Sequence, residues 1–220
     1  MSVSKNGGRI MINRLFSFAT AAVIVGLAWN SFGEASEQGL PDATFAPVGA
    51  ETSIPYGWVD FCYRHSEECT LGMLKPVDIR LDKQVWKILN EINAFANRAI
   101  EPISNFDHWG TNLDHWDYPV DGRGDCKIFT LFKRKLLIER GFPRQALLIT
   151  IVRDHRGEGH AVLTVKTDRG DFVLDNLSEA IRSWNSTGYK FYKRQAQTDP
   201  NVWLSLGGVT GVEPNEAAAN

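Results

Sequence analysis

The sequence predicts an α+β fold in which an amphipathic helix packs on an antiparallel sheet. Residues 126–140 carry apolar side chains at helical spacing. Three short runs rich in β-branched and aromatic residues follow between residues 146 and 175, separated by turn residues. A length of 220 residues with 43% apolar content suits one domain with a sizeable core.

The expected helix begins at Cys126, after a loop that contains Gly122, Gly124 and Asp125. Asp125 is a good N-cap residue, and Gly141 follows the last turn. One face carries a largely apolar stripe of Ile128, Leu131, Phe132, Lys135 and Leu136. The thiol of Cys126 is therefore expected in the first turn, where unpaired amide N–H groups favour a thiolate. The alternative is that Cys126 is a small buried core residue.

Three strands are expected after this helix, at 146–152, 160–166 and 171–175. The turn Thr167–Gly170 makes the last two a hairpin. His160 opens one strand of the hairpin and Asp175 ends the other, so they can be cross-strand neighbours. Direct opposition would need a bulge or a longer loop, because it centres the turn between Thr167 and Asp168.

A second helix is expected between Val77 and Ile103, where apolar residues recur at helical spacing before Pro102. The segment 105–119 contains Asp-His-Trp twice. Its two histidines and its aspartates suggest a metal site, but a structured loop with aromatic anchors explains them better. Residues 177–206 carry scattered aromatic residues, which are typical of strands and loops that pack on a sheet.

The two ends of the chain differ from the domain at 57–208. Residues 1–35 have a basic start, a short apolar run at 15–28 and small residues at Gly33 and Ala35, which predicts a secretory signal peptide. An uncleaved anchor is the alternative, although the run is short for a bilayer span. We expect a linker at 36–56, a disordered tail at 209–220, and a periplasmic or secreted protein.

The charge of the chain argues against a nucleic-acid partner. The formal net charge is −2, and loss of residues 1–35 makes it more negative, since most of the charged residues in that segment are basic. No segment after residue 35 is apolar enough to span a membrane.

Three cysteines follow the expected signal peptide. Cys62 and Cys69 lie seven residues apart, which predicts a local disulfide in an exported chain. A zinc site would need more ligands than the nearby His65 supplies. This pairing leaves Cys126 as a free thiol. With His160 and Asp175 it completes the set that a cysteine protease needs: a nucleophile, an imidazole to take its proton and a carboxylate to orient that imidazole.

At these residues the chain resembles a known family. The blocks that carry the resemblance are Trp116–Pro119 followed by Asp125-Cys126, then Gly159–Leu163, and Leu174–Leu177. They are similar to those of the bacterial transglutaminase-like cysteine proteinases, LapG-like members included. The resemblance covers residues 57–206 and implies a papain/transglutaminase-like fold. It also implies Cys126 as nucleophile, His160 as base and acid, and Asp175 as the residue that orients His160. The best-known relatives are periplasmic and cleave a surface adhesin.

One departure from the family concerns calcium. LapG-like members carry acidic residues directly after the cysteine, which contribute to a calcium site, whereas this chain has Lys127 and Ile128 there. A lysine repels a cation and isoleucine offers no oxygen ligand, so we expect no metal and no other cofactor. Lys127 is expected to help hold the thiolate instead.

The leading hypothesis is an exported cysteine endopeptidase that acts on a protein or peptide substrate, such as a cell-surface protein. A transglutaminase or a deamidase would use the same acyl-enzyme chemistry and the same three residues. A non-catalytic secreted binding module is the alternative from a different class, and it predicts an unreactive Cys126. A regulatory receptor partner is not identified by any sequence feature.

Overall fold

The computed structural model describes residues 39–70 and 72–207. The expected signal peptide and the expected C-terminal tail both lie outside these residues. Within them the helices are α1 (Tyr56–Arg64), α2 (Lys83–Ala99), α3 (Asn105–Trp109) and α4 (Cys126–Glu139), with short 3-10 turns η1 (Ser66–Glu68), η2 (Arg144–Ala146) and η3 (Trp184–Ser186).

A seven-stranded antiparallel sheet forms the centre of the domain. Its spatial order is β1-β9-β8-β4-β5-β6-β7. The strands are β1 (Val48–Thr52), β4 (Leu147–Arg153), β5 (Gly159–Thr167), β6 (Gly170–Leu174), β7 (Arg182–Ser183), β8 (Lys190–Gln195) and β9 (Trp203–Leu206). The three expected strands are thus β4, β5 and β6, and they are adjacent in the sheet.

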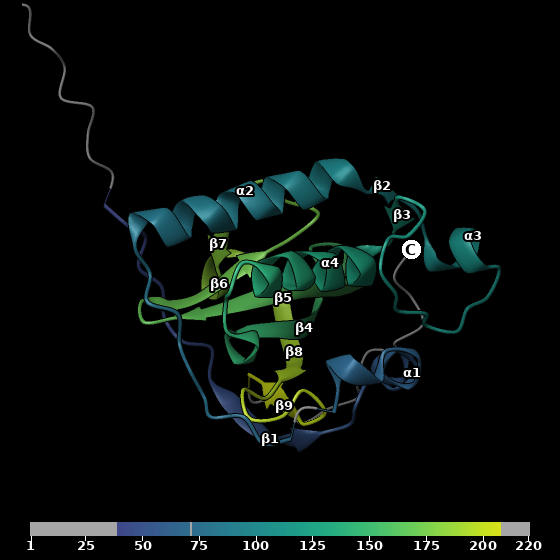
Figure 1. Cartoon of the computed structure of the whole chain (residues 1–220), viewed down its shortest axis with the longest axis horizontal. Helices are drawn as coiled ribbons and strands as arrows, with labels where there is room; N and C mark the ends of the chain where they lie inside the picture. The colour runs from purple at the N-terminus through teal and green to yellow at the C-terminus, as the bar shows by residue number, and fades with distance from the viewer. Residues whose placement is uncertain (1–38, 71, 208–220) are drawn as a thin grey trace, which may run out of the picture. The chain divides into compact units, whose positions relative to one another are not determined.

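Helix α4 packs against β5, and α2 packs against α4, so both helices lie on one side of the sheet (Figure 1). Asp82 caps the start of α2, where its side chain accepts a hydrogen bond from the amide of Val85 at 2.8 Å. At the end of α4, Gly141 adopts a φ of 84° and donates its amide to Ile138, as expected for a glycine just beyond a helix. The predicted ends of the nucleophile helix are confirmed.

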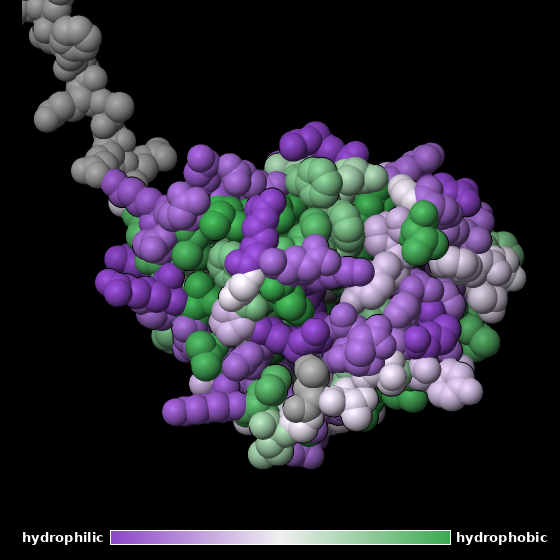
Figure 2. Space-filling view, in the orientation of Figure 1, coloured by the Kyte–Doolittle hydropathy of each residue, from purple (hydrophilic) through white to green (hydrophobic). Residues whose placement is uncertain are grey.

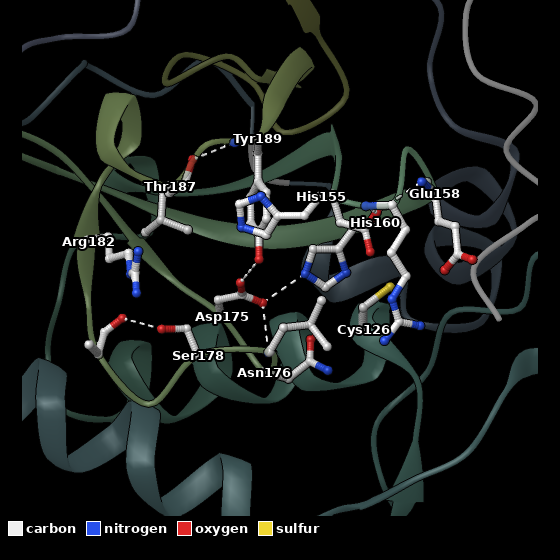
Figure 3. Close-up of a pocket in the computed structure, with 16 residues that line it drawn as sticks. Cys126, His155, Glu158, His160, Asp175, Asn176, Ser178, Arg182, Thr187 and Tyr189 are labelled. Carbon is white, nitrogen blue, oxygen red and sulfur yellow. Dashed lines mark hydrogen bonds and ion pairs between the residues drawn. The ribbon is translucent and has the colours of Figure 1, made fainter.

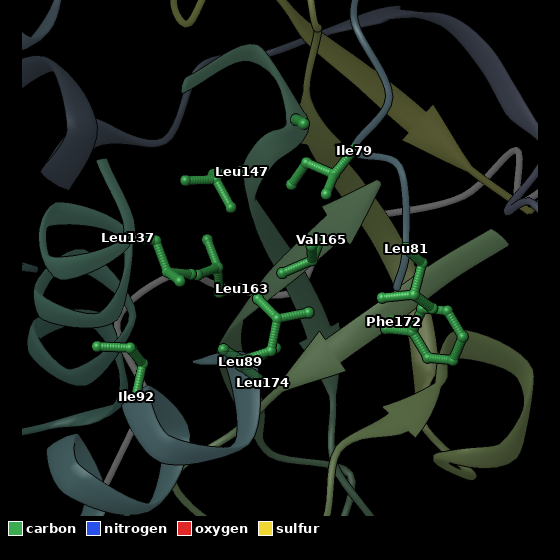
Figure 4. Packing of buried hydrophobic residues seen from close by; sticks show 11 residues of the cluster. Ile79, Leu81, Leu89, Ile92, Leu137, Leu147, Leu163, Val165, Phe172 and Leu174 are labelled. Carbon is green, nitrogen blue, oxygen red and sulfur yellow. The ribbon is translucent and has the colours of Figure 1, made fainter. Parts of the chain in front are cut away.

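The main hydrophobic core lies between these two helices and strands β4, β5 and β6 (Figure 4). Its buried members include Leu89, Ile92, Leu137, Leu147, Leu163, Val165, Phe172 and Leu174. Alternate residues of each strand face the helices, as the two-residue period of a strand requires. Burial of each such side chain stabilises the fold by about 1.5–3 kcal/mol. On the face in Figure 2, hydrophilic and hydrophobic residues are interspersed.

A second, two-stranded parallel sheet joins the end of α2 to the loop before α4. Its strands are β2 (Glu101–Pro102) and β3 (Arg123–Gly124). The amide of Glu101 donates to the carbonyl of Gly122 at 2.8 Å, and the amide of Ile103 donates to Gly124 at 3.1 Å. A Cβ at Gly124 would lie 2.4 Å from the side chain of Ile128. Glycine is therefore required where the loop meets the helix.

The expected linker at residues 36–56 needs correction for the part that the structure describes. Residues 48–52 form β1, which pairs with β9, and Ala46 is buried. The domain therefore starts before residue 57. The segment after β1 begins with α1, which the sequence does not indicate and in which Trp58 and Phe61 are buried. Only these two large apolar residues face the core, which is too few for a clear helical period.

The hairpin of β5 and β6 has a different register from direct opposition of His160 and Asp175. Thr167 pairs with Gly170 and Leu163 with Leu174, so the turn contains only Asp168 and Arg169. His160 and Asp175 are consequently diagonal neighbours, and the expected bulge or longer loop is not needed. Diagonal residues still lie on the same face, within reach of long side chains.

The disulfide between Cys62 and Cys69 is present, with Cα atoms 5.7 Å apart. The loop at 105–119 is structured, as expected. Trp116 is buried, and its indole N–H donates to Asp114 at 2.6 Å.

Residues 39–70 and 72–207 contain no group of three or more histidine, cysteine or acidic residues placed to hold a metal ion. No helix in that part of the chain is long and apolar enough to cross a membrane.

Candidate active site

The nucleophile candidate Cys126 is the first residue of α4. Asp125 caps the helix, and its carboxylate accepts the amide of Lys127 at 3.1 Å. The thiol is 7% exposed and is the only free cysteine in the described chain. The cap thus binds amides of the first turn and holds Cys126 at the N-terminal end of the helix, where the dipole favours negative charge.

His160 and Asp175 form a direct pair. Nε2 of His160 lies 2.8 Å from Oδ1 of Asp175, and both side chains are buried. Figure 3 shows the Cys126 side chain beside the imidazole ring, which lies between the thiol and the carboxylate. Because Asp175 uses Nε2, Nδ1 remains as the nitrogen that can exchange a proton with Cys126. The structure therefore brings the three predicted residues together in the order that the chemistry requires.

The electrostatics of the pair favour a charged imidazole. Burial lowers the pKa of His160, but hydrogen bonds with Asp175 and Cys126 and the charges of both groups outweigh it and raise the pKa to about 10. Burial raises the pKa of Asp175, yet hydrogen bonds from His160 and Tyr189 bring it below its ordinary value. An imidazolium between a carboxylate and a thiol is the arrangement that sustains a thiolate.

Three residues that the sequence did not indicate hold Asp175. Asn93 of α2 accepts the amide of Asp175 at 3.2 Å, and Asn97 donates to its carbonyl at 3.0 Å. The Tyr189 hydroxyl donates to Oδ2 at 2.6 Å. Asn93 also binds the carbonyls of Ser178 and Glu179. No sequence signal links these residues to Asp175, because they are far from it along the chain.

Lys127, expected to help hold the thiolate, is buried beside the nucleophile. Its ammonium lies 2.8 Å from Asp114 and 2.6 Å from Asp125. Burial lowers its pKa, but the charges of Cys126, Asp125 and Asp114 more than compensate, so the pKa lies above its ordinary value. The permanent positive charge next to Cys126 adds to that of His160.

Lys133 is a second buried lysine on α4, nearer the C-terminal end of the helix than Lys127. It is 1% exposed, and its ammonium has no hydrogen-bond partner among residues 39–70 and 72–207. Burial lowers its pKa to about 7, against the opposing charges of Asp175 and Glu179. Nothing in the sequence singles out this residue, since a lysine in an amphipathic helix usually marks the solvated face.

A cavity of about 410 Å³ opens over the three residues (Figure 3). One wall is the loop between β4 and β5, and the other is the segment that follows Asp175. The lining includes Cys126, His155, Glu158, His160, Arg182 and Tyr189. The thiol is therefore accessible from a concave surface of mixed charge.

Comparison with protein families decides the relationship. The family model described as bacterial transglutaminase-like cysteine proteinase BTLCP matches residues 48–210, which is most of the chain. The chain belongs to this family. The resemblance seen in the sequence is thus confirmed, together with the α+β, transglutaminase-like fold and the assignment as a cysteine peptidase. As a bacterial transglutaminase-like cysteine proteinase, the protein carries a thiol on a helix that packs on an antiparallel sheet.

Among solved structures, this proteinase is similar to Legionella pneumophila LapG, at 26% identity over 55% of this chain and 68% of that chain, with a TM-score of 0.47. The calcium-bound form of LapG shares 24% identity over 60% of this chain and 76% of that one, with a TM-score of 0.46. The EGTA-treated form shares 25% identity over 58% and 70%, with a TM-score of 0.45. No curated protein matches the chain.

Proposed function

We propose that this cysteine proteinase is an exported endopeptidase that cleaves a protein substrate through Cys126, His160 and Asp175. The observation that supports this most is the contact of His160 with both other residues, at 2.8 Å from Asp175 and beside the thiol. The apolar, basic-flanked start of the sequence supports export, to the periplasm or the exterior. A cell-surface protein is the substrate class that fits such a location.

The reaction starts from the thiolate of Cys126 and the imidazolium of His160. The sulfur attacks the carbonyl carbon of the scissile peptide bond, and the carbonyl oxygen becomes negatively charged. Backbone N–H groups at the start of α4, that of Cys126 included, stabilise this oxyanion. The tetrahedral intermediate then collapses, His160 gives its proton to the leaving amine, and a thioester to Cys126 remains.

Hydrolysis completes the cycle. Neutral His160 takes a proton from a water molecule, which attacks the thioester carbonyl. The second tetrahedral intermediate expels the sulfur, and the new carboxylic acid leaves while Cys126 and His160 return to their charged forms. Asp175 keeps Nε2 of the ring occupied throughout, so that Nδ1 always faces the reacting atoms.

The test compares wild type with Cys126→Ala and His160→Ala on secreted proteins of the same cell. Wild type should release fragments that neither variant releases. Identical patterns for wild type and Cys126→Ala would exclude proteolysis for that set of proteins. Thr130→Ser, which keeps the hydroxyl that donates to the Cys126 carbonyl at 2.8 Å, serves as a control that retains activity.

The same purified protein can also be tested for the transglutaminase and deamidase activities, which would pass through the same acyl-enzyme. With a glutamine-containing peptide and a primary amine, mass spectrometry distinguishes chain scission, loss of the amide nitrogen and incorporation of the amine. Scission supports the endopeptidase, while the other products indicate a deamidase or a transglutaminase. Failure of iodoacetamide to alkylate Cys126 at neutral pH would favour a binding module, since a thiolate at a helix start alkylates readily.

A further inference from the structure

Tyr189 contacts both members of the His160–Asp175 pair. Its hydroxyl donates to Oδ2 of Asp175 at 2.6 Å, while Nε2 of His160 lies 2.8 Å from Oδ1. The centroids of the Tyr189 and His160 rings are 5.8 Å apart, at an interplanar angle of 80°. One side chain therefore binds the free oxygen of the carboxylate and packs against the imidazole that the carboxylate orients (Figure 3).

The position of Tyr189 is itself fixed from two sides. Its amide donates to the hydroxyl of Thr187 at 3.2 Å, and Thr187 donates to the carbonyl of Trp184 at 2.8 Å. On the other side the ring of His155, from the loop between β4 and β5, lies 4.9 Å away between centroids. The tyrosine is thus held between two loops that both line the cavity.

Gly188 leaves the space that this packing needs. Its φ is 75°, and a Cβ built there would lie 2.7 Å from Cε1 of His155. Any other residue would be strained in this conformation and would displace the histidine ring. The backbone of the turn before β8 therefore allows the ring of Tyr189 to pack against both His155 and His160.

We propose that Tyr189 is a positioning residue of this active site, which fixes the rotation of the Asp175 carboxylate and covers the His160–Asp175 hydrogen bond on the cavity side. This rests on the proposed role of Cys126, His160 and Asp175. With one oxygen bound to the tyrosine and the other to the histidine, the carboxylate has a single orientation. The ring also keeps water from the hydrogen bond, which strengthens it.

Other charged groups act on the same two residues. Asp154 and Arg182 lie close enough to influence Tyr189, and Lys133 of α4 interacts with Asp175 through space. Leu177 donates its amide to Oδ1 of Asp175 at 3.0 Å. None of these groups contacts Oδ2 in the described chain, so the tyrosine hydroxyl is the donor whose removal leaves that oxygen unbound.

The test is Tyr189→Phe, which removes the hydroxyl and keeps the ring. We expect kcat to fall about ten-fold, because a hydrogen bond to a charged group is lost, and KM to change by no more than about two-fold. Tyr192→Phe is the matched control on β8, where the ring lies near Arg153 and away from Asp175. It should leave both constants unchanged.

A second readout needs no substrate, so it separates this proposal from the proposed protease activity. The rate at which iodoacetamide alkylates Cys126 is measured against pH. Loss of the tyrosine donor raises the pKa of Asp175, so the acid limb of the profile should move to higher pH in Tyr189→Phe. A shifted limb in a protein that cleaves nothing would support the positioning role and refute the protease.

Two results would overturn the proposal. One is a Tyr189→Phe variant with wild-type kcat and an unshifted alkylation profile. The other is a fall in activity that follows a fall in melting temperature while the alkylation limb stays in place, which would make the tyrosine a structural residue only. Tyr189→Leu, which also removes the ring, should reduce kcat further than Tyr189→Phe, and equal values of kcat would overturn the covering role of the ring.

Discussion

The ammonium of Lys127 lies 2.8 Å from Oδ1 of Asp114, and both groups are buried. The same ammonium lies 2.6 Å from Asp125, the N-cap of the nucleophile helix. Lys127 thus joins the loop that precedes the active site to the first turn of α4. Two buried carboxylates share one cation that belongs to the chain itself.

Replacement of this cation should destabilise the fold. In Lys127→Met the two carboxylates are left buried without a cation to balance their charge, and we expect the free energy of unfolding to fall by about 3–5 kcal/mol. Urea denaturation followed by circular dichroism measures it. Lys87→Met is the control, because its exposed pair with Glu91 should contribute less than about 1 kcal/mol. Equal stability of Lys127→Met and wild type would contradict the role assigned to the pair.

Removal of divalent metal should have no effect. The ammonium of Lys127 already neutralises Asp114 and Asp125, and a second cation beside it would be repelled. We expect EDTA or EGTA to leave both the rate of substrate cleavage and the melting temperature unchanged. A drop of several degrees on chelation, reversed by calcium, would show that aspartates elsewhere on the chain assemble a site.

The charge of His160 predicts a pH dependence of stability. Its pKa is raised from 6.5 to about 10 in the folded state, so its contribution is complete below 6.5 and is lost as the pH rises towards 10. Wild type should therefore exceed His160→Gln in stability most at low pH, with a difference that declines over this range. Urea denaturation of both proteins across the range measures it, and a constant difference would refute the charged pair.

The buried ammonium of Lys133 predicts the opposite dependence of stability on pH. Its pKa falls from 10.5 to about 7 in the folded state, which means that folding disfavours the charged ammonium. Lys133 therefore lowers the free energy of unfolding most below pH 7, and this loss vanishes above pH 10.5. Lys133→Met should raise the melting temperature at neutral pH, with a gain that shrinks as the pH increases. A loss of stability in this variant would mean that the ammonium has a favourable partner in solution.

The cysteines predict a simple thiol count. Cys62 and Cys69 are bonded and Cys126 is free, so unfolding without reduction should expose one thiol to Ellman's reagent. Reduction should add the other two and lower the free energy of unfolding by about 2–3 kcal/mol, as expected for closure of a short loop. A mixed disulfide on Cys126 in the isolated protein would contradict this assignment.

The elements that carry Cys126, His160 and Asp175 were predictable because their signals are local. Asp125 caps the start of the helix and Gly141 follows its last turn, so both signals lie within a single stretch of chain. The strand around His160 is recognisable from its β-branched residues alone. The disulfide follows from the spacing of two cysteines. In each case the interaction that shapes the element lies within a few residues of it.

The remainder depends on contacts between distant segments. Asn93 and Tyr189 meet Asp175 only after the sheet and helices have assembled, and nothing in their neighbours indicates this. The sequence does not indicate strand β1, because residues 36–56 are rich in small residues and show little periodicity, and only pairing with β9 makes it a strand. His160 and Asp175 are cross-strand neighbours as predicted, but the register of the hairpin makes them diagonal and not directly opposed, and the sequence does not fix that register.

Helix α2 touches the active site at two separate points. Its end continues into β2, which pairs with the strand just before Cys126, and its Asn93 and Asn97 bind the backbone of Asp175. Asp175 also follows directly on β6, which pairs with the strand that carries His160. The backbone that carries the carboxylate is therefore held by α2 on one side and by the sheet on the other, and the packing of α2 fixes both the loop before the thiol and the carboxylate that orients the imidazole.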